Sequence, residues 1–311
     1  MKIAVMGSGA VGGYFGGRLA QVGEDVAFVA RGRQLAAMRE RGLRIASPRG
    51  DLHLPSVRVT DDPASIGPVD LVFFTVKLWS TEEAGRQIAP LVGPDTAVIS
   101  LQNGVEANDV LARAVGREHL MGGVCYIAAS LDESGSVEHR GQMARLVFGE
   151  PGGARTRRAQ AFLEACARAR AGFDAELSSD IDRAIWEKFV FIVGLSALTS
   201  LTRRSIGPVR SDPDTRAMLL DVMRETVAVG RAKGVDLSAD FADQRLAFAD
   251  TLPPGMTSSM YNDLERGNRL EVGWLSGAVV RLGREAGVPT PANRAVYAAL
   301  KLHAGADGAK P

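Results

Sequence analysis

The chain has 311 residues, of which 46% are hydrophobic and 23% are charged, so it is long enough to form about two domains with sizeable cores. Its 37 basic and 36 acidic residues leave a net charge of +1, which argues against binding to nucleic acid or to an anionic membrane. The two cysteines and four histidines have no metal-ligand spacing, which disfavours a disulfide scaffold and a metal site.

The first half of the chain alternates short apolar segments with amphipathic ones. We predict strands at 2–6, 25–30, 70–76, 96–101, 124–129, 136–139 and 145–148, helices at 12–21, 34–41, 81–91, 106–115 and 154–171, and a small hairpin or meander within 43–60. Alternation of this kind predicts an α/β fold, a Rossmann-type, doubly wound parallel sheet with helices on both faces.

The second half has helical periodicity and no clear strand pattern. We predict helices at 180–200, 213–233, 239–249, 269–286 and 291–302, separated by glycine and proline. The predicted organisation is therefore an NADP-binding domain over residues 1–175 and an all-helical, substrate-binding and catalytic domain over residues 176–311.

No targeting or membrane segment is apparent. The first strand leads directly into a glycine-rich turn, unlike a signal peptide, and the longest nearly apolar run, 189–198, has ten residues where a spanning helix needs about 20. We expect a soluble cytoplasmic protein. The run is apolar on nearly all sides and must be buried, either by the domain's own helices or by the second subunit of a homodimer.

Residues 7–12 form a GxGxxG motif that follows the first predicted strand and opens the first predicted helix, the context in which the motif binds a dinucleotide pyrophosphate at a helix N-terminus. Glycine is expected at the first position for the turn, at the second for close approach of the pyrophosphate, and at the third for helix–strand packing. An ordinary glycine-rich turn is the alternative. The predicted cofactor-binding residues of the motif are Gly7, Ser8, Gly9, Ala10, Val11 and Gly12.

The end of the second predicted strand indicates which dinucleotide is bound. NAD sites usually have Asp or Glu there for the ribose hydroxyl, whereas this chain has Arg31-Gly32-Arg33, and the nearby acidic residues precede the strand. An arginine can pair with a 2′-phosphate through two hydrogen bonds. We therefore predict NADPH, with Arg31 as the main contact and Arg33 as a second one; a solvated basic turn is the alternative.

Three polar residues are catalytic candidates. Lys77 and Asn103 each follow the carboxyl end of a buried strand, where folds of this kind bind ligands. The alternative for Lys77 is a solvated loop lysine, and the alternative for Asn103 is a structural role in an Asn-Gly turn. Lys188 shares an otherwise apolar helix face, where a partly buried ammonium suits a general acid and a lysine reaching to solvent is the alternative. That face also carries Ile181, Ala184, Ile185, Ile192 and Leu195.

A late segment offers partners for these groups. Ser259 can cap the following helix or bind a ligand. Glu271 is predicted in the first turn of the helix at 269–286, where a carboxylate is favourable even without a binding role.

At these positions the sequence resembles the ketopantoate reductase (2-dehydropantoate 2-reductase) family over nearly its whole length. The matching segments are GSGAVG at 7–12, TVKLWS around Lys77, SLQNG around Asn103, WEKFVF around Lys188, and TSSMYNDLERGNRLE at 257–271.

The resemblance implies a Rossmann domain and a helical domain with the active site between them, and hydride transfer from NADPH to the C2 carbonyl of a 2-oxo acid. It implies that Lys188 is the catalytic lysine, that Asn103 lies near both cofactor and substrate, and that Lys77 is an active-site lysine. It also implies that Ser259 and Glu271 bind the substrate, with Glu271 counted among the catalytic residues.

The sequence departs from the family at three positions. Family members that reduce ketopantoate have asparagines where this chain has Ile192, Ser196 and Ile206. We count Ser196 among the predicted substrate-binding residues, but an isoleucine cannot hydrogen-bond a hydroxyl or carboxylate, and sites of that kind discriminate strongly between substrates.

The first hypothesis is therefore NADPH-dependent reduction of a 2-oxo acid to a 2-hydroxy acid, with ketopantoate as first candidate. One alternative is an NADPH-dependent reductase of a different, more apolar 2-oxo acid. The other is an NADP-binding sensor without catalytic activity.

Overall fold

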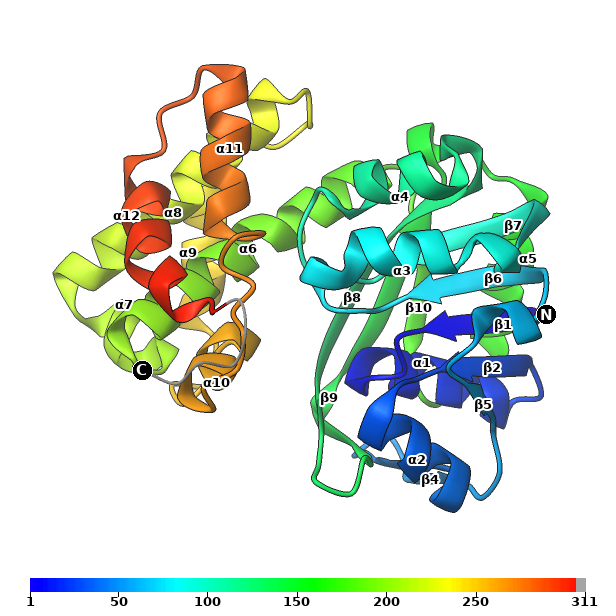
Figure 1. Cartoon of the computed structure of the whole chain (residues 1–311). Coiled ribbons are helices and arrows are strands. Elements are labelled where there is room, and N and C mark those ends of the chain that lie inside the picture. Colours follow the sequence, from blue (N-terminus) through cyan, green and yellow to red (C-terminus); the bar gives the residue numbers. More distant parts are fainter. Residues whose placement is uncertain (306–311) are drawn as a thin grey trace. The chain divides into compact units, whose positions relative to one another are not determined.

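The computed structural model describes residues 1–305 (Figure 1), and the chain forms two compact units. The first contains Met1–Gln102 and Ala107–Ala184, and the second contains Asn103–Glu106 and the chain from Ile185 onward. By this division the first unit ends in the first turn of helix α6 (Ile181–Thr202), and one short loop belongs to the second unit although it lies in the N-terminal half of the sequence.

The first unit is built on a ten-stranded mixed sheet in the order β4-β3-β9-β8-β7-β6-β1-β2-β5, with β10 also paired to β9. The pairs from β5 to β8 are all parallel, which confirms the predicted Rossmann-type core. The strands are β1 (Lys2–Met6), β2 (Asp25–Val29), β3 (Leu43–Ala46), β4 (Leu52–Leu54), β5 (Arg58–Thr60), β6 (Val69–Phe74), β7 (Val92–Ser100), β8 (Leu120–Leu131), β9 (Val137–Gly149) and β10 (Asp174–Leu177).

Side chains that alternate along the central strands enter different cores. Ile3 and Val5 of β1 belong to the apolar cluster that contains α1 (Ala10–Gln21), α2 (Gly32–Arg41) and α5 (Arg157–Arg168). Ala4 and Met6 belong to the cluster formed with α3 (Thr81–Gln87) and α4 (Ala107–Val115). Because successive strand residues point to opposite faces, both faces of the sheet are covered by helices, as the sequence predicts.

The second unit is helical throughout its described part and has one apolar core. Helix α8 contacts α7, α9, α11 and α12. The α-helices of this unit after α6 are α7 (Ile206–Ser211), α8 (Pro213–Ala232), α9 (Phe241–Asp250), α10 (Ser259–Glu265), α11 (Ser276–Ala286) and α12 (Pro291–Leu300). The short 3₁₀ helices of the two units are η1 (Pro63–Ser65), η2 (Leu78–Ser80), η3 (Ala89–Leu91), η4 (Arg117–His119), η5 (Pro151–Gly153) and η6 (Lys301–His303).

Helix α6 is the one described helix that is long and apolar enough to cross a membrane, judged by length and composition. In its most apolar window, 61% of the residues are buried inside the structure, and Phe189, Val193 and Leu198 pack in the helical core. This burial is typical of a core helix. The chain's own helices cover the apolar run at 189–198, so the run gives no separate indication of a second subunit.

Several element predictions were wrong in detail. The sheet is not parallel throughout, because β8 and β9 pair as a long antiparallel hairpin, and β9 is one strand where two were predicted. The short helices α7 and α10 and strand β10 were not predicted. Helix α11 begins at Ser276 rather than at residue 269, because a turn over 272–275 precedes it.

Candidate functional site

The glycine motif forms the turn between β1 and α1. Gly7 has φ +98°, a backbone conformation that residues with a Cβ rarely adopt, and an added Cβ would lie 2.8 Å from the backbone nitrogen of Val76. The backbone N–H groups of Gly7 and Ser8 both donate to the carbonyl oxygen of Val29, at 3.2 and 3.1 Å. The turn is therefore held between the ends of β6 and β2.

Gly12 and Gly9 serve the motif in different ways. An added Cβ on Gly12 would lie 2.5 Å from both the carbonyl oxygen of Gly7 and Oγ1 of Thr75, whereas one on Gly9 would meet no atom within 4 Å. The Thr75 hydroxyl in turn donates to the Gly7 carbonyl at 2.6 Å. The close packing predicted for Gly12 is confirmed, and the space in front of Gly9 is open.

The first turn of α1 offers backbone donors beside that open space. The helix begins at Ala10 with Gly9 as its N-cap, and the N–H of Gly13 is bonded to the Gly9 carbonyl at 2.7 Å. The N–H groups of Ala10, Val11 and Gly12 precede that of Gly13, the first with an acceptor inside the helix, so they have no intrahelical partner. This end of α1 can hold an anionic group.

Ser8 is placed differently from what its position in the motif suggests. Its side chain is buried, and its hydroxyl donates to the carbonyl oxygen of Val29 at 3.0 Å. With both its N–H and its hydroxyl directed at strand β2, Ser8 fixes the turn, and its contact with a cofactor stays a prediction.

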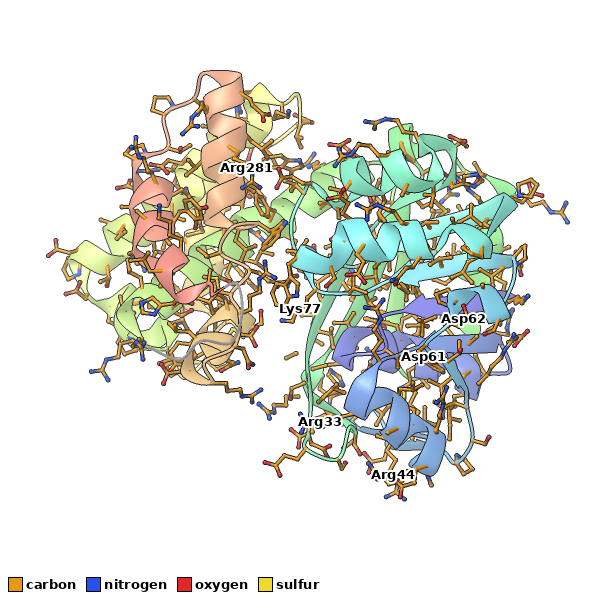
Figure 2. All side chains as sticks on the ribbon, in the orientation of Figure 1. Arg33, Arg44, Asp61, Asp62, Lys77 and Arg281 are labelled. Carbon is orange, nitrogen blue, oxygen red and sulfur yellow. The ribbon has the colours of Figure 1, made fainter. Side chains whose placement is uncertain are left out.

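Arg31 lies just beyond the carboxyl end of β2, as the N-cap of α2. Its side chain is exposed, and its Nη1 donates to Oε1 of Glu83 on α3 at 3.2 Å. Its Nη2 donates to Oε1 of Gln87 on the same helix. Arg33 is exposed in the first turn of α2 (Figure 2). The structure thus places a guanidinium where the sequence predicts one, already engaged by two side chains.

Lys77 follows β6 and is exposed, with its Nζ 5.6 Å from the centre of the Trp79 ring (Figure 2). The loop that carries it is fixed by Gln102, whose side-chain Nε2 donates to the carbonyl oxygen of Val76 at 2.8 Å and to Oγ1 of Thr81 at 2.9 Å. Sequence reasoning missed Gln102. Its position after strand β7, directly before Asn103, was a signal that could have found it.

Lys188 and Asn103, both in the second unit, are brought together. Lys188 is half-buried on α6, and its Nζ donates to Oδ1 of Asn103 at 2.9 Å. Positive φ in the Asn-Gly turn is taken by Gly104, not by Asn103, so Asn103 is not the left-handed residue of that turn. The ammonium of Lys188 has three N–H donors. One of them orients the side chain through Asn103, and another can be directed at an oxygen atom of a ligand.

The positions that depart from the family pattern lie in different surroundings. Ile192, one turn after Lys188 on α6, is half-buried, and Ser196 after it is buried. Ile206 is 0% exposed and packs in the helical core, with its N–H donating to the Met256 carbonyl at 2.9 Å. Of the two isoleucines, Ile192 alone keeps an exposed surface that a ligand could contact.

In the late segment, the capping alternative for Ser259 and the helical position predicted for Glu271 are wrong. Ser258, not Ser259, caps helix α10, accepting from the N–H of Tyr261 at 3.0 Å, and Ser259 is exposed in the first turn. Glu271 is buried, but it lies in the turn before α11 rather than in a helix. Its backbone carbonyl accepts from Trp274 at 2.9 Å, so the helix dipole does not account for its presence.

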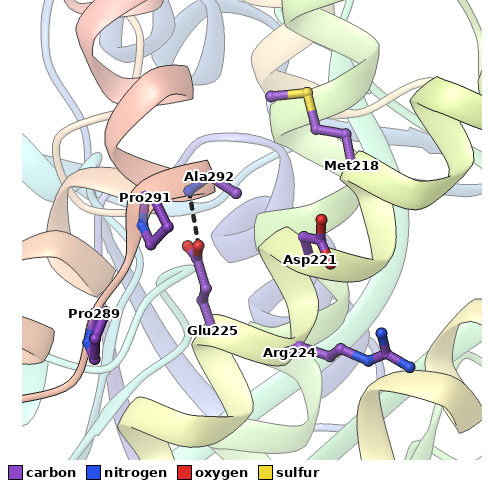
Figure 3. Close-up of a pocket in the computed structure, with 7 residues that line it drawn as sticks. All are labelled: Met218, Asp221, Arg224, Glu225, Pro289, Pro291 and Ala292. Carbon is purple, nitrogen blue, oxygen red and sulfur yellow. Dashed lines mark hydrogen bonds between the residues drawn. The ribbon is translucent and has the colours of Figure 1, made fainter.

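No group of three or more metal-binding side chains occurs within residues 1–305. A pocket of about 620 Å³ lies beside α8 and the start of α12, and none of the predicted site residues lines it (Figure 3). Its Glu225 accepts from the backbone N–H groups of Ala292 and Asn293, at 2.7 and 2.8 Å. This carboxylate caps α12 and has a structural role.

Comparison with known proteins agrees with this architecture. The family described as "Ketopantoate reductase PanE/ApbA" matches residues 3–153, and its C-terminal counterpart matches residues 180–304.

Individual relatives match over almost their full length. The chain is 32% identical to a 2-dehydropantoate 2-reductase of Mesorhizobium japonicum over 97% of each chain, and 29% identical to an uncharacterized oxidoreductase, YkpB, of Bacillus subtilis over 97% of this chain and 99% of the relative. A crystal structure of a ketopantoate reductase from Ralstonia eutropha superimposes with a TM-score of 0.88, at 35% identity over 98% of both chains. The chain is therefore an oxidoreductase that belongs to the ketopantoate reductase family.

Proposed function

We propose that the protein reduces a 2-oxo acid to a 2-hydroxy acid with NADPH, and that ketopantoate is the first candidate substrate. The observation that carries the proposal is the 2.9 Å hydrogen bond between Lys188 and Asn103, because it fixes an ammonium donor on an otherwise apolar helix face. Family membership and the relatives named 2-dehydropantoate 2-reductase support the same chemistry.

The residues of the first unit fit a dinucleotide. Gly7 and Gly12 have no room for a Cβ, Gly9 faces open space, and the amides of the first turn of α1 lie beside that space. Ala10, Val11 and Gly12 would bind the pyrophosphate through their N–H groups. NADPH, when bound, supplies a hydride to the carbonyl carbon of the substrate.

The residues of the second unit supply the proton and the orientation. Lys188 binds the carbonyl oxygen of the substrate and donates a proton to it as negative charge develops there, which completes the hydroxyl group. Asn103 holds the Lys188 ammonium through its amide oxygen. Ser196, Ser259 and Glu271 are the residues we assign to substrate binding, and Lys77 joins Asn103 in contacting the cofactor.

Arg31 is the residue we assign to cofactor choice. It follows β2 where NAD-dependent proteins usually have an acidic residue, and its guanidinium can pair with a 2′-phosphate. A carboxylate at the same position would repel that phosphate.

Ile192 favours a second candidate substrate, a more apolar 2-oxo acid. Its partly exposed side chain lies one helical turn from Lys188 and offers no hydrogen bond to a substrate hydroxyl. Sites that lack such a bond do not select for the hydroxyl.

Oxidation of NADPH and NADH over a panel of 2-oxo acids tests the proposal. The panel should contain ketopantoate and its analogue without the hydroxyl, 3,3-dimethyl-2-oxobutanoate. Turnover of ketopantoate above the others supports the first candidate, and preference for the analogue supports the second. Tight NADPH binding without turnover of any member would indicate a sensor and contradict the enzymatic proposal.

The cofactor assignment has its own test. Arg31→Ala should raise the Kd for NADPH at least about tenfold, the effect of a lost charged contact, and leave NADH unaffected. Arg39→Ala is the matched control, because Arg39 lies on the same helix and pairs with Asp61. Equal losses for both cofactors would contradict the assignment.

A further inference from the structure

Both terminal nitrogens of Arg31 donate to side chains of one helix. Nη1 donates to Oε1 of Glu83 at 3.2 Å, and Nη2 donates to Oε1 of Gln87. Glu83 and Gln87 are four residues apart on α3, and Nε2 of Gln87 donates to the same Glu83 oxygen at 3.1 Å. The three side chains form a closed set of hydrogen bonds.

This arrangement uses two of the five N–H donors of the guanidinium, one on each terminal nitrogen. A guanidinium recognises a phosphate best through two parallel N–H groups, and here one N–H of each terminal nitrogen is directed at an acceptor of α3, one anionic and one neutral. A 2′-phosphate that pairs with Arg31 through the N–H now bonded to Glu83 must displace that carboxylate, and Glu83 offsets part of the guanidinium charge that attracts the phosphate.

We propose that Glu83 modulates cofactor specificity: its carboxylate competes with the 2′-phosphate for Arg31 and narrows the preference for NADPH over NADH. The proposal rests on the proposed function, since it takes Arg31 as the residue that binds the phosphate. NADH lacks that phosphate, so its binding is not expected to depend on Glu83.

The exposure of the pair sets the size of the effect. The side chains of Arg31 and Glu83 are 57% and 61% exposed, and exposed ion pairs contribute little, so their loss changes an equilibrium about two- to fivefold. Glu83 therefore adjusts the affinity that Arg31 provides and does not abolish it.

Calorimetric titration of the full-length protein with NADPH and with NADH, at fixed ionic strength, tests the competition. Glu83→Gln should lower the Kd for NADPH about two- to fivefold and leave the Kd for NADH unchanged. Glu82→Gln is the matched control: it removes the same charge from the neighbouring position, but Glu82 pairs with Arg86 at 2.7 Å and not with Arg31. Glu83→Ala should act in the same direction as Glu83→Gln.

The double variant Arg31→Ala/Glu83→Gln separates the possible failures. If Glu83 acts through Arg31, Glu83→Gln should have no effect on NADPH binding once Arg31 is absent. An unchanged or weakened affinity of Glu83→Gln for NADPH, or an equal gain in Glu82→Gln, would overturn the competition and leave the assignment of Arg31 intact. If Arg31→Ala alone binds NADPH as tightly as the parent protein, the cofactor assignment itself fails.

Discussion

The two compact units hold their candidate functional groups in different ways. In the first unit the groups are largely backbone amides, and their position depends on Gly7 and Gly12, which pack closely against the chain at the end of β6, and on the bonds of the turn to Val29 of β2. In the second unit they are side chains, above all Lys188 on a buried helix and Asn103 in the loop that contacts it.

Substitutions in the two units are therefore expected to differ in how they affect stability and catalysis. A substitution in the glycine turn changes the space available to the backbone, so it is expected to affect folding and cofactor binding together. A change to the Lys188 ammonium removes a proton donor from a half-buried position and leaves the helical core in place.

The largest effect is expected in the second unit. Lys188→Ala should lower kcat about 10²–10⁴-fold, the usual range for loss of a general acid, with little change in Tm because the apolar part of α6 is untouched. Lys233→Ala, which alters an exposed lysine at the end of α8, is the control. Steady-state kinetics and thermal unfolding check both, and full activity of Lys188→Ala would remove Lys188 from the mechanism.

Within the first unit, two glycines should respond differently. Gly12→Ala places a Cβ 2.5 Å from the Gly7 carbonyl oxygen and should lower the free energy of unfolding by about 1–3 kcal/mol through overpacking. Gly9→Ala meets no protein atom within 4 Å, so it should keep its stability and lose NADPH affinity. Chemical unfolding measures the free energy of unfolding of both variants, and titration measures their affinity for NADPH. Equal destabilisation of both variants would contradict the expected difference between Gly12 and Gly9.

The sequence allowed the architecture of the first unit to be predicted because its signals are local. The GxGxxG turn and the buried strands at 2–6 and 70–76 each show in a few adjacent residues, and the parallel core follows from their alternation with helices. The β8–β9 hairpin and β10 were less accessible, since strand pairing between distant segments depends on tertiary packing.

In the candidate site, the type of residue was predictable and its local role often was not. Lys188 and Asn103 are 85 positions apart, and their hydrogen bond appears only in the folded chain. Ser258 and Ser259 are equivalent as helix caps in the sequence, and the choice between them depends on where α10 begins. Glu83 was not identified at all, because its link to Arg31 joins separate helices.

The two units also differ in where their carboxylates with lowered pKa values lie. In the first unit, Glu150 is buried and pairs with Arg158. Burial raises its pKa, but hydrogen bonds from Arg158 and Thr156 outweigh this and hold the pKa below its ordinary value of 4.5. In the second unit, the pKa values of Asp212 and Asp240 are also lowered, by hydrogen bonds with Thr215 and Gln244 respectively, but both residues are exposed.

Glu150→Gln should therefore destabilise the first unit by about 1–3 kcal/mol at neutral pH, through loss of charged hydrogen bonds in a buried position. Because the folded pKa is depressed, the contribution of Glu150 is full above pH 4.5 and is lost as the pH falls through the lower, folded value. Urea unfolding at pH 7 and pH 4 measures this, and a constant difference between variant and parent would contradict it. Asp212→Asn in the second unit serves as the exposed comparison.

The smallest expected effect comes from His139, buried on β9, with its Nδ1 2.8 Å from the Ser47 hydroxyl and its Nε2 3.0 Å from the Met143 carbonyl oxygen. Burial lowers its pKa below 6.5, the bond to Met143 opposes this, and the charges of Arg18 and Arg49 lower it further. The unfolded chain therefore binds the proton more readily than the folded one. Stability should fall as the pH drops below 6.5, with a slope of at most about 1.4 kcal/mol per pH unit for one proton.

His139→Gln should remove this part of the pH dependence, whereas His53→Gln, at an exposed position on β4, should leave it unchanged. Urea unfolding of the parent and both variants between pH 5.5 and 7.5 isolates the slope, because the carboxylates stay ionised over that range. If the parent and His139→Gln lose stability in parallel, the proton that destabilises the first unit binds elsewhere. If the stability of His139→Gln alone does not change between pH 5.5 and 7.5, the sensitivity of this unit to mild acid arises at His139 in its sheet. It then does not arise in the glycine turn on which cofactor binding depends.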